Sequence, residues 1–110
     1  MSKKLTEKEL LFMLSAEAEK SGVNLTYTHR IFFLRLLEYA ERNGVEEADG
    51  FRVALSVAEL SRVLDISLRT TTQSLNRLAA CGALQRITER KTYPRSPTVT
   101  FIEKKYFVKE

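Results

Sequence analysis

Two short amphipathic helical patterns, separated by only a few residues, occupy residues 56–84. Ser56 and Glu59 have the S-x-x-E spacing of a capping box, which starts a helix. Apolar residues then recur at helical spacing, and Asp65 is one of the residue types that tolerate the left-handed backbone at a helix end. Ser67 is an N-cap residue for a second helix. The spacing therefore predicts two helices joined by a tight turn.

The second helix has an apolar face that we expect to pack inward. Thr71, Leu75 and Leu78 recur at spacings of four and three, which places them on one side of a helix. Thr71 is then half-buried, and its hydroxyl needs a hydrogen-bond partner. Gly82 is expected to end the helix as its C′ glycine.

The opposite face of this helix contains neither acids nor lysines. No Asp, Glu or Lys occurs in residues 67–81, whereas threonines, which are mediocre helix formers, fill positions 70–72. Short hydrogen-bonding side chains and arginines suit base edges and phosphates. Arg69 can bond guanine with two donors, and Gln73 or Asn76 can pair with adenine. We expect a helix-turn-helix with residues 67–81 in the major groove of double-stranded DNA. The alternative is an ordinary buried helix pair with a bland surface.

A basic hairpin, or wing, is expected next. Two β-rich runs, residues 83–89 and 98–102, flank a polar segment that holds both prolines of the chain. The tip, residues 89–97, is either a solvated turn or a contact for the DNA backbone or minor groove. Its candidate contact residues are Arg90, Lys91, Tyr93 and Arg95. A further strand predicted at residues 51–55 pairs with this hairpin.

Together with the predicted hairpin, residues 56–84 resemble the winged helix-turn-helix regulators of bacteria and archaea, in particular the DNA-binding domain of catabolite-activator-type regulators. The resemblance covers roughly half of the chain. It is carried by Ser56, Glu59, Leu60, Leu64, Ile66, Ser67, Thr70, Leu75, Leu78, Gly82 and Leu84. The chain departs from the family pattern at Asp65, where Gly is favoured, at Thr71, where Val is favoured, and at Ala83, where Leu is favoured.

The resemblance implies a mainly α fold with a small antiparallel β-sheet, in which two N-terminal helices belong to a winged helix-turn-helix protein. It implies base contacts for Leu68, Arg69, Thr72 and Gln73. It implies a position near the DNA backbone for Ser56, Ser67 and Thr70. Outside the wing, the full set of candidate DNA-binding residues is Ser56, Ser67, Leu68, Arg69, Thr70, Thr72, Gln73, Asn76 and Arg77.

Charge is unevenly distributed along the chain. Residues 1–50 hold seven basic and nine acidic side chains, whereas residues 51–110 hold eleven basic and five acidic ones. The net charges of these parts are −2 and +6. The basic part contains the helix-turn-helix pattern, and a cationic face attracts a polyanion in a salt-dependent manner.

The N-terminal part predicts two further helices. Thr6 and Glu9 form a second capping box, and another helix is expected from Thr26 or Thr28 to Asn43. We divide the chain into residues 1–25, a helix for packing or dimerisation, and a winged domain at residues 26–110. Residues 7–20 are expected to cover the second helix within the chain or across a dimer. We favour a homodimer, because twofold dimers suit palindromic sites. The acidic residues 45–50 are expected to form an exposed turn.

Several classes of function are disfavoured. No apolar run approaches the ~20 residues of a membrane span, and no signal peptide is visible. Cys81, the single cysteine, fits a reducing cytoplasm, and we expect it to be buried. His29, the only histidine, is expected at the surface early in a helix. No metal site, cofactor motif, small-molecule site or catalytic pair is evident, so we do not expect an enzyme.

The leading hypothesis is a small sequence-specific DNA-binding protein that regulates transcription. A role in replication or plasmid maintenance uses the same chemistry. The competing hypotheses are a winged-helix protein-interaction module and an RNA-binding protein that uses the wing together with the basic tail residues Lys104, Lys105 and Lys109. Isolated Tyr93 and Tyr106 disfavour the RNA hypothesis, because stacking platforms use several aromatic side chains.

Overall fold

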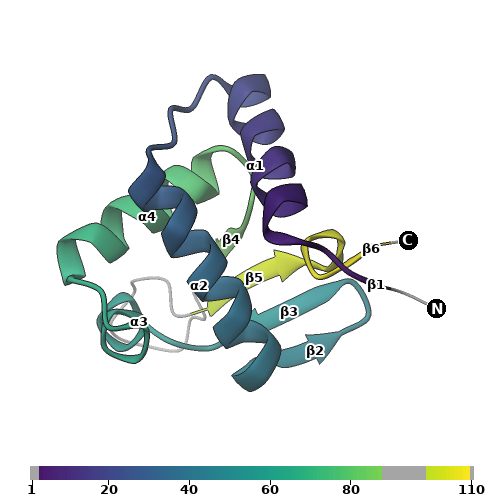
Figure 1. Ribbon diagram of the computed structural model, residues 1–110. Coiled ribbons are helices and arrows are strands. Elements are labelled where there is room, and N and C mark those ends of the chain that lie inside the picture. Colours follow the sequence, from purple (N-terminus) through teal and green to yellow (C-terminus); the bar gives the residue numbers. More distant parts are fainter. Residues whose placement is uncertain (1–2, 88–98, 110) are drawn as a thin grey trace.

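The computed structural model describes residues 3–87 and 99–109 and has the predicted winged helix-turn-helix arrangement, mainly helical with a small antiparallel sheet (Figure 1). In chain order the elements of these residues are β1 (Lys3–Lys4), α1 (Glu7–Ser21), α2 (Tyr27–Asn43), β2 (Val45–Glu47), β3 (Gly50–Val53), α3 (Val57–Leu64), α4 (Leu68–Ala80), β4 (Gln85–Ile87), β5 (Val99–Glu103), a 3-10 helix η1 (Lys104–Tyr106) and β6 (Val108–Lys109).

Side-chain caps start each of the four α-helices in the described part of the chain. Thr6, Thr26 and Ser56 each form a reciprocal capping box at the start of α1, α2 and α3. The Ser67 hydroxyl accepts a hydrogen bond from the Thr70 amide at the start of α4. Each cap satisfies amides that have no partner inside the helix. The helix starts predicted from these residues are therefore confirmed.

One backbone conformation and two hydrogen bonds fix the turn between α3 and α4. Asp65 adopts the left-handed conformation, with φ of 55°, as the sequence predicts. The Ser61 hydroxyl donates to the Ile66 carbonyl at 2.6 Å. From α2, Arg35 Nη1 donates to the Leu64 carbonyl at 3.2 Å. The Leu64 carbonyl at the end of α3 is thereby occupied, and α2 holds the turn in place.

The core lies between α2, α4 and the sheet. Phe32, Phe33 and Leu36 of α2 belong to the same buried cluster as Leu75 and Leu78 of α4. The helices α2 and α4 are in extensive contact. Together with α3, they form the helical layer on the left of Figure 1. The amphipathic spacing of α4 therefore correctly predicts its inward face.

Thr71 is more deeply buried than the sequence predicts. It is 0 % exposed rather than half-buried, because α4 presses this position directly against the core. Its hydroxyl has no hydrogen-bond partner in the described part of the chain, and neither has that of Ser74, one turn away. A buried hydroxyl without a partner destabilises the fold.

The sheet has the strand order β2-β3-β5-β4, and every neighbouring pair is antiparallel. The strand expected at residues 51–55 is β3, which pairs with β5, and β5 pairs with β4. At the β4–β5 pair, Arg86 lies opposite Thr100 and donates a hydrogen bond to its hydroxyl. These two strands form the described base of the predicted hairpin.

Residues 48–49 form the exposed turn that the sequence predicts, but the prediction is wrong for the rest of residues 45–50. Residues 45–47 form β2, an edge strand paired with β3. Glu47 binds Arg52 at 2.9 Å, and Glu46 binds Lys104 at 2.7 Å. Two of the three acids, Glu46 and Glu47, therefore have cationic partners, on η1 and on β3 respectively.

The C-terminal segment completes the core, which the sequence did not reveal. Tyr106 packs edge-on against Phe33 with ring centroids 5.2 Å apart, and Phe107 lies 4.2 Å from Phe51. Strand β6 then pairs with β1 at the right of Figure 1, so the described ends of the chain are neighbours. In addition, α1 packs on α2 and contributes Leu14 and Ala18 to the core.

We expect Thr71→Val to stabilise the protein by about 1 kcal/mol, because it removes an unpartnered buried hydroxyl and keeps the side-chain shape. Urea unfolding measures this change in the free energy of unfolding. Thr72→Val is the matched control: Thr72 is exposed and its hydroxyl donates to the Leu68 carbonyl, so we expect a change within about 0.5 kcal/mol. Destabilisation by Thr71→Val would show that this hydroxyl has a partner.

Candidate nucleic-acid interface

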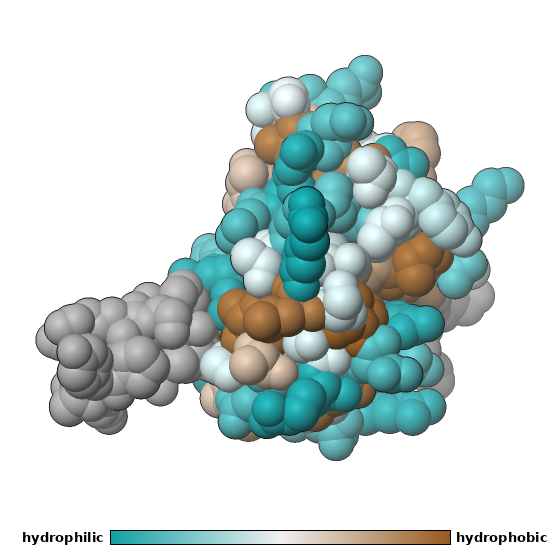
Figure 2. Space-filling view, turned by 90° about the vertical axis from the view of Figure 1, so that its left-hand side faces the viewer, coloured by the Kyte–Doolittle hydropathy of each residue, from teal (hydrophilic) through white to brown (hydrophobic). Residues whose placement is uncertain are grey.

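The outer face of α4 is open to solvent. Its exposed side chains follow the helical period and are Leu68, Arg69, Thr72, Gln73, Asn76, Arg77 and Ala80, while Thr70 is half-buried at the edge. Figure 2 shows the side of the molecule on which α3 and α4 lie, and its surface is largely hydrophilic with smaller apolar areas between. Leu68, which is 54 % exposed, and Val63 are the large exposed apolar residues of these two helices.

Three side chains of this face retain their full hydrogen-bonding capacity. In the described part of the chain, Arg69, Gln73 and Asn76 make no hydrogen bond or ion pair. They offer a fork of donors and two amide groups, the chemistry that distinguishes guanine and adenine in the major groove. Neighbouring Thr72 uses its hydroxyl proton on the Leu68 carbonyl at 2.9 Å, so it remains only an acceptor there.

The hydroxyl protons of the capping serines are not used in the caps. Ser67 Oγ accepts from the Thr70 amide at 3.1 Å, and Ser56 Oγ accepts from the Glu59 amide at 3.2 Å. Both hydroxyls can still donate to an anion, because a cap uses only an oxygen lone pair. The first turn of α4 contains no acid, so the positive end of its dipole is not neutralised there. This end of α4 is suited to a phosphate.

A polar hollow of about 500 Å³ lies between α4 and the start of α2. It is lined by Thr70, Gln73, Asn76 and Arg77 of α4 and by Thr28 and His29 of α2, with the N-cap residue Thr26. Arg77 Nη1 donates to the Asn24 carbonyl at 2.8 Å, so the guanidinium is held in position at this hollow. Arginine and a helix N-terminus both favour a bound anion.

The candidate residues predicted from the sequence do not include Thr26 and Thr28. The sequence marks Thr26 only as a helix start, and nothing near it in the chain indicates that α2 begins beside α4. The T-x-x-H spacing from Thr26 to His29 was the available signal, since it marks a helix N-terminus with hydroxyls around it.

His29 is not a surface residue, which corrects the sequence prediction. It is 7 % exposed, because its ring folds back over the start of α2 and faces α4. Nδ1 accepts a hydrogen bond from the Thr26 amide at 3.2 Å, and the His29 amide donates to Thr26 Oγ1 at 3.4 Å. Burial, followed by the nearby positive charge of Arg77, lowers the pKa of His29. The neutral imidazole is therefore the form that caps α2.

The predicted wing contacts Arg90, Lys91, Tyr93 and Arg95 lie outside the described residues. Two of the basic tail residues are engaged elsewhere: Lys104 pairs with Glu46, and Lys105 pairs with Glu17 at 3.3 Å. Cys81 is buried, as expected, and burial raises the pKa of its thiol.

Residues 3–87 and 99–109 contain no group of three metal-ligating side chains and no helix long and apolar enough to span a membrane.

Comparison with known proteins gives structural similarity alone. No protein-family model and no curated protein sequence matches the chain. A solved structure described as the N-terminal domain of a DNA-binding protein superposes with a TM-score of 0.58 at 20% identity, over 84% of this chain and 69% of that one. Reduced CprK without ligand superposes with a TM-score of 0.44 at 17% identity, over 86% of this chain and 43% of that one. The first similarity establishes a shared fold.

We expect the stability of the protein to depend on His29 protonation. Its pKa is lowered from 6.5 in the folded state, so the unfolded chain binds more protons just below that pH. The stabilisation is complete above pH 6.5 and is lost as the pH falls through the folded pKa. The variant His29→Gln keeps a capping side chain without a titrating ring.

Urea unfolding of both proteins between about pH 7.5 and pH 5 measures this contribution. The free energy of unfolding of the wild type should fall relative to that of His29→Gln as the pH decreases. Subtracting the free energy of unfolding of His29→Gln from that of the wild type at each pH removes the contribution of the carboxylates that both proteins contain. A constant difference across this range would contradict a buried neutral imidazole.

Proposed function

We propose that this protein binds double-stranded DNA sequence-specifically and acts as a small transcriptional regulator, with α4 in the major groove. The observation that carries the proposal is the solvent-open face of α4, which has no acidic residue and holds Arg69, Gln73 and Asn76 without partners among the described residues. In a helix whose role is structural, Glu and Lys would serve solubility and helicity better on such a face. The shared fold with a structure described as a DNA-binding protein is consistent with this function.

Base recognition is assigned to the centre of this face. Arg69 donates two hydrogen bonds to guanine, and Gln73 or Asn76 pairs with the adenine edge. Leu68 contacts a thymine methyl group, which explains an exposed leucine at the start of the helix. Thr72 completes this group as a hydrogen-bond acceptor.

Backbone contacts are assigned to the periphery of the same face. Ser56, Ser67 and Thr70 donate to phosphates from helix starts. Arg77 and the polar hollow beside it bind a further phosphate. The wing, residues 89–97, contacts the backbone or the minor groove through Arg90, Lys91, Tyr93 and Arg95.

The protein is proposed to act in the cytoplasm as a homodimer without a cofactor. Residues 26–110 form the DNA-binding domain, and residues 1–25 supply packing or dimerisation. A twofold dimer presents two copies of α4 to a palindromic site. Use of the same surface in replication or plasmid maintenance would leave these contacts unchanged. A protein-interaction module is the competing function, and the exposed Leu68 of α4 and Val63 of α3 would then contact a partner protein.

We expect Arg69→Ala to relax sequence preference by about 1–3 kcal/mol at one position of the target site, because a bidentate contact to guanine is lost. Arg95→Ala should instead weaken binding to all duplexes alike. Selection from random duplexes followed by electrophoretic shift measures both effects. Arg42→Ala is the control, because Arg42 is an exposed arginine near the far end of α2. An unchanged ranking of sites in Arg69→Ala would refute the assignment of α4.

We expect DNA affinity to decrease steeply with salt. If ~5 to 7 phosphates are neutralised, the affinity should fall by orders of magnitude between about 50 and 200 mM salt. A steep slope without sequence enrichment would leave only nonspecific binding. No binding to any duplex at low salt would favour the protein-interaction module.

A further inference from the structure

Helix α1 has an exposed aromatic side chain that no function described so far uses. Phe12 is 75 % exposed although it lies near the middle of α1. Lys8, one turn earlier, lies on the same flank, as expected for a spacing of four. Together with Leu5, Glu9 and Met13 they line a shallow apolar hollow. An exposed apolar patch of this kind marks an interaction surface.

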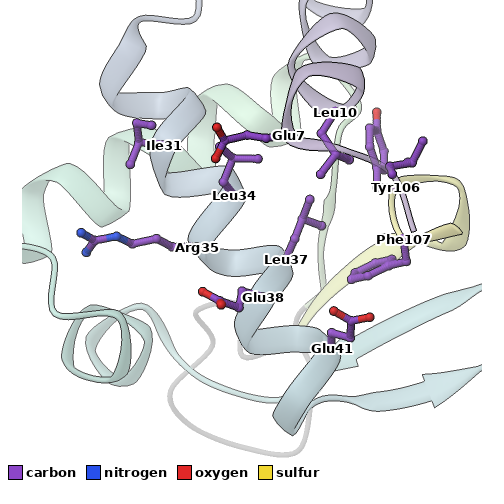
Figure 3. Close-up of a pocket in the computed structure, with 11 residues that line it drawn as sticks. Glu7, Leu10, Ile31, Leu34, Arg35, Leu37, Glu38, Glu41, Tyr106 and Phe107 are labelled. Atoms are coloured by element: carbon purple, nitrogen blue, oxygen red, sulfur yellow. The ribbon is translucent and has the colours of Figure 1, made fainter. Parts of the chain in front are cut away.

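An apolar groove of about 410 Å³ lies on the other flank of α1, between α1 and α2. Its apolar side chains include Leu10 of α1, Leu34 and Leu37 of α2, and Phe107 near the C-terminus (Figure 3). Figure 3 shows Leu37 pointing from α2 towards the side of the groove where Leu10 and Phe107 lie. The volume is within the range of about 300–1,000 Å³ of sites that bind small organic groups, so it is sufficient for one aromatic side chain.

The border of this groove is acidic. Glu7 reaches from α1 towards α2, and Glu38 and Glu41 lie along the lower part of α2 in Figure 3. Arg35 is the one cation among the lining residues that the structure describes, and its guanidinium donates to the Leu64 carbonyl. Arg42, outside the groove, forms an exposed ion pair with Glu38 at 3.6 Å, so the three acids still outnumber the two cations. An occupant with an aromatic group and a neighbouring positive charge therefore complements this groove.

The exposed flank of α1 has this chemistry. Phe12 is the aromatic group, and Lys8 is the cation one turn away on the same flank. Leu5 lines both the hollow and the groove, so the two surfaces are contiguous. A surface that contains both a protruding group and its complementary groove is self-complementary, which is the requirement for a twofold interface.

We propose that a second copy of this chain occupies the groove, with Phe12 of each protomer inserted between α1 and α2 of the other. Lys8 of each protomer then faces the acidic border formed by Glu38 and Glu41 of its partner. The inference deepens the proposed function, since it assigns the proposed homodimer to α1 and α2. It leaves α4 free, because Phe12, Lys8 and the groove are all outside that helix.

Sedimentation equilibrium of the full chain, without DNA, tests the proposal. We expect a reversible dimer, and Phe12→Glu should raise its dissociation constant by about 30-fold or more, as for a central aromatic anchor. Tyr27→Glu is the matched control, because Tyr27 is an equally exposed aromatic residue, at 76 %, that lies outside both surfaces. It should leave the dissociation constant unchanged. Circular dichroism spectra of both variants serve as the control for folding and should match that of the wild type.

A charge exchange tests the orientation of the two copies. Lys8→Glu and Glu38→Lys should each weaken the dimer, and the double variant should restore at least part of the affinity. A wild-type chain that stays monomeric, a mass that grows beyond the dimer, equal effects of Phe12→Glu and Tyr27→Glu, or no rescue in the double variant would each overturn the proposal.

Electrophoretic shift with a single half-site keeps this proposal separate from the proposed function. Phe12→Glu should still bind the half-site, because α4 is unchanged. A monomeric wild type that binds DNA would reject the interface and keep the function. A dimer sensitive to Phe12→Glu that binds no duplex would keep the interface and reject the function.

Discussion

The packing of α4 against α2 is the interaction on which the fold and the candidate interface both depend. Thr71, Leu75 and Leu78 are buried on one side of α4. Because an α-helix has 3.6 residues per turn, burial of this side directs Arg69 and Gln73 outward. The contact from Arg35 to the end of α3 fixes the turn that precedes α4. The outward face is thus a consequence of the core, and its side chains are free to be selected for binding.

The features that the sequence predicted correctly are those decided within a few residues. A cap such as Ser56 with Glu59 closes over three positions, so its residue types and spacing suffice to place a helix start. The left-handed turn at Asp65 is similarly local. The helical period alone was enough to predict the inward face of α4. The polar residues lie on the remaining side of the helix, so their exposure followed from the same period. The assignment of that face to DNA also required an argument from the hydrogen-bonding groups of its side chains and from its lack of acids.

The features that the sequence did not reveal depend on partners far away in the chain. Glu46 and Lys104 are 58 residues apart, and only their contact shows why an acidic segment forms an edge strand. His29 is buried because α2 begins beside α4, which no local pattern indicates. Thr71 has the same explanation: its position on the inner face was predictable, but the complete burial of its hydroxyl depends on the tightness of the α2–α4 contact.

Opposite charges are segregated onto different surfaces, which makes the two proposed interactions compatible. Glu7, Glu38 and Glu41 border the groove of α1 and α2, and this acidic border repels phosphate, whereas α4 contains no acid. If the proposed function holds, DNA is thereby directed away from the proposed dimer interface.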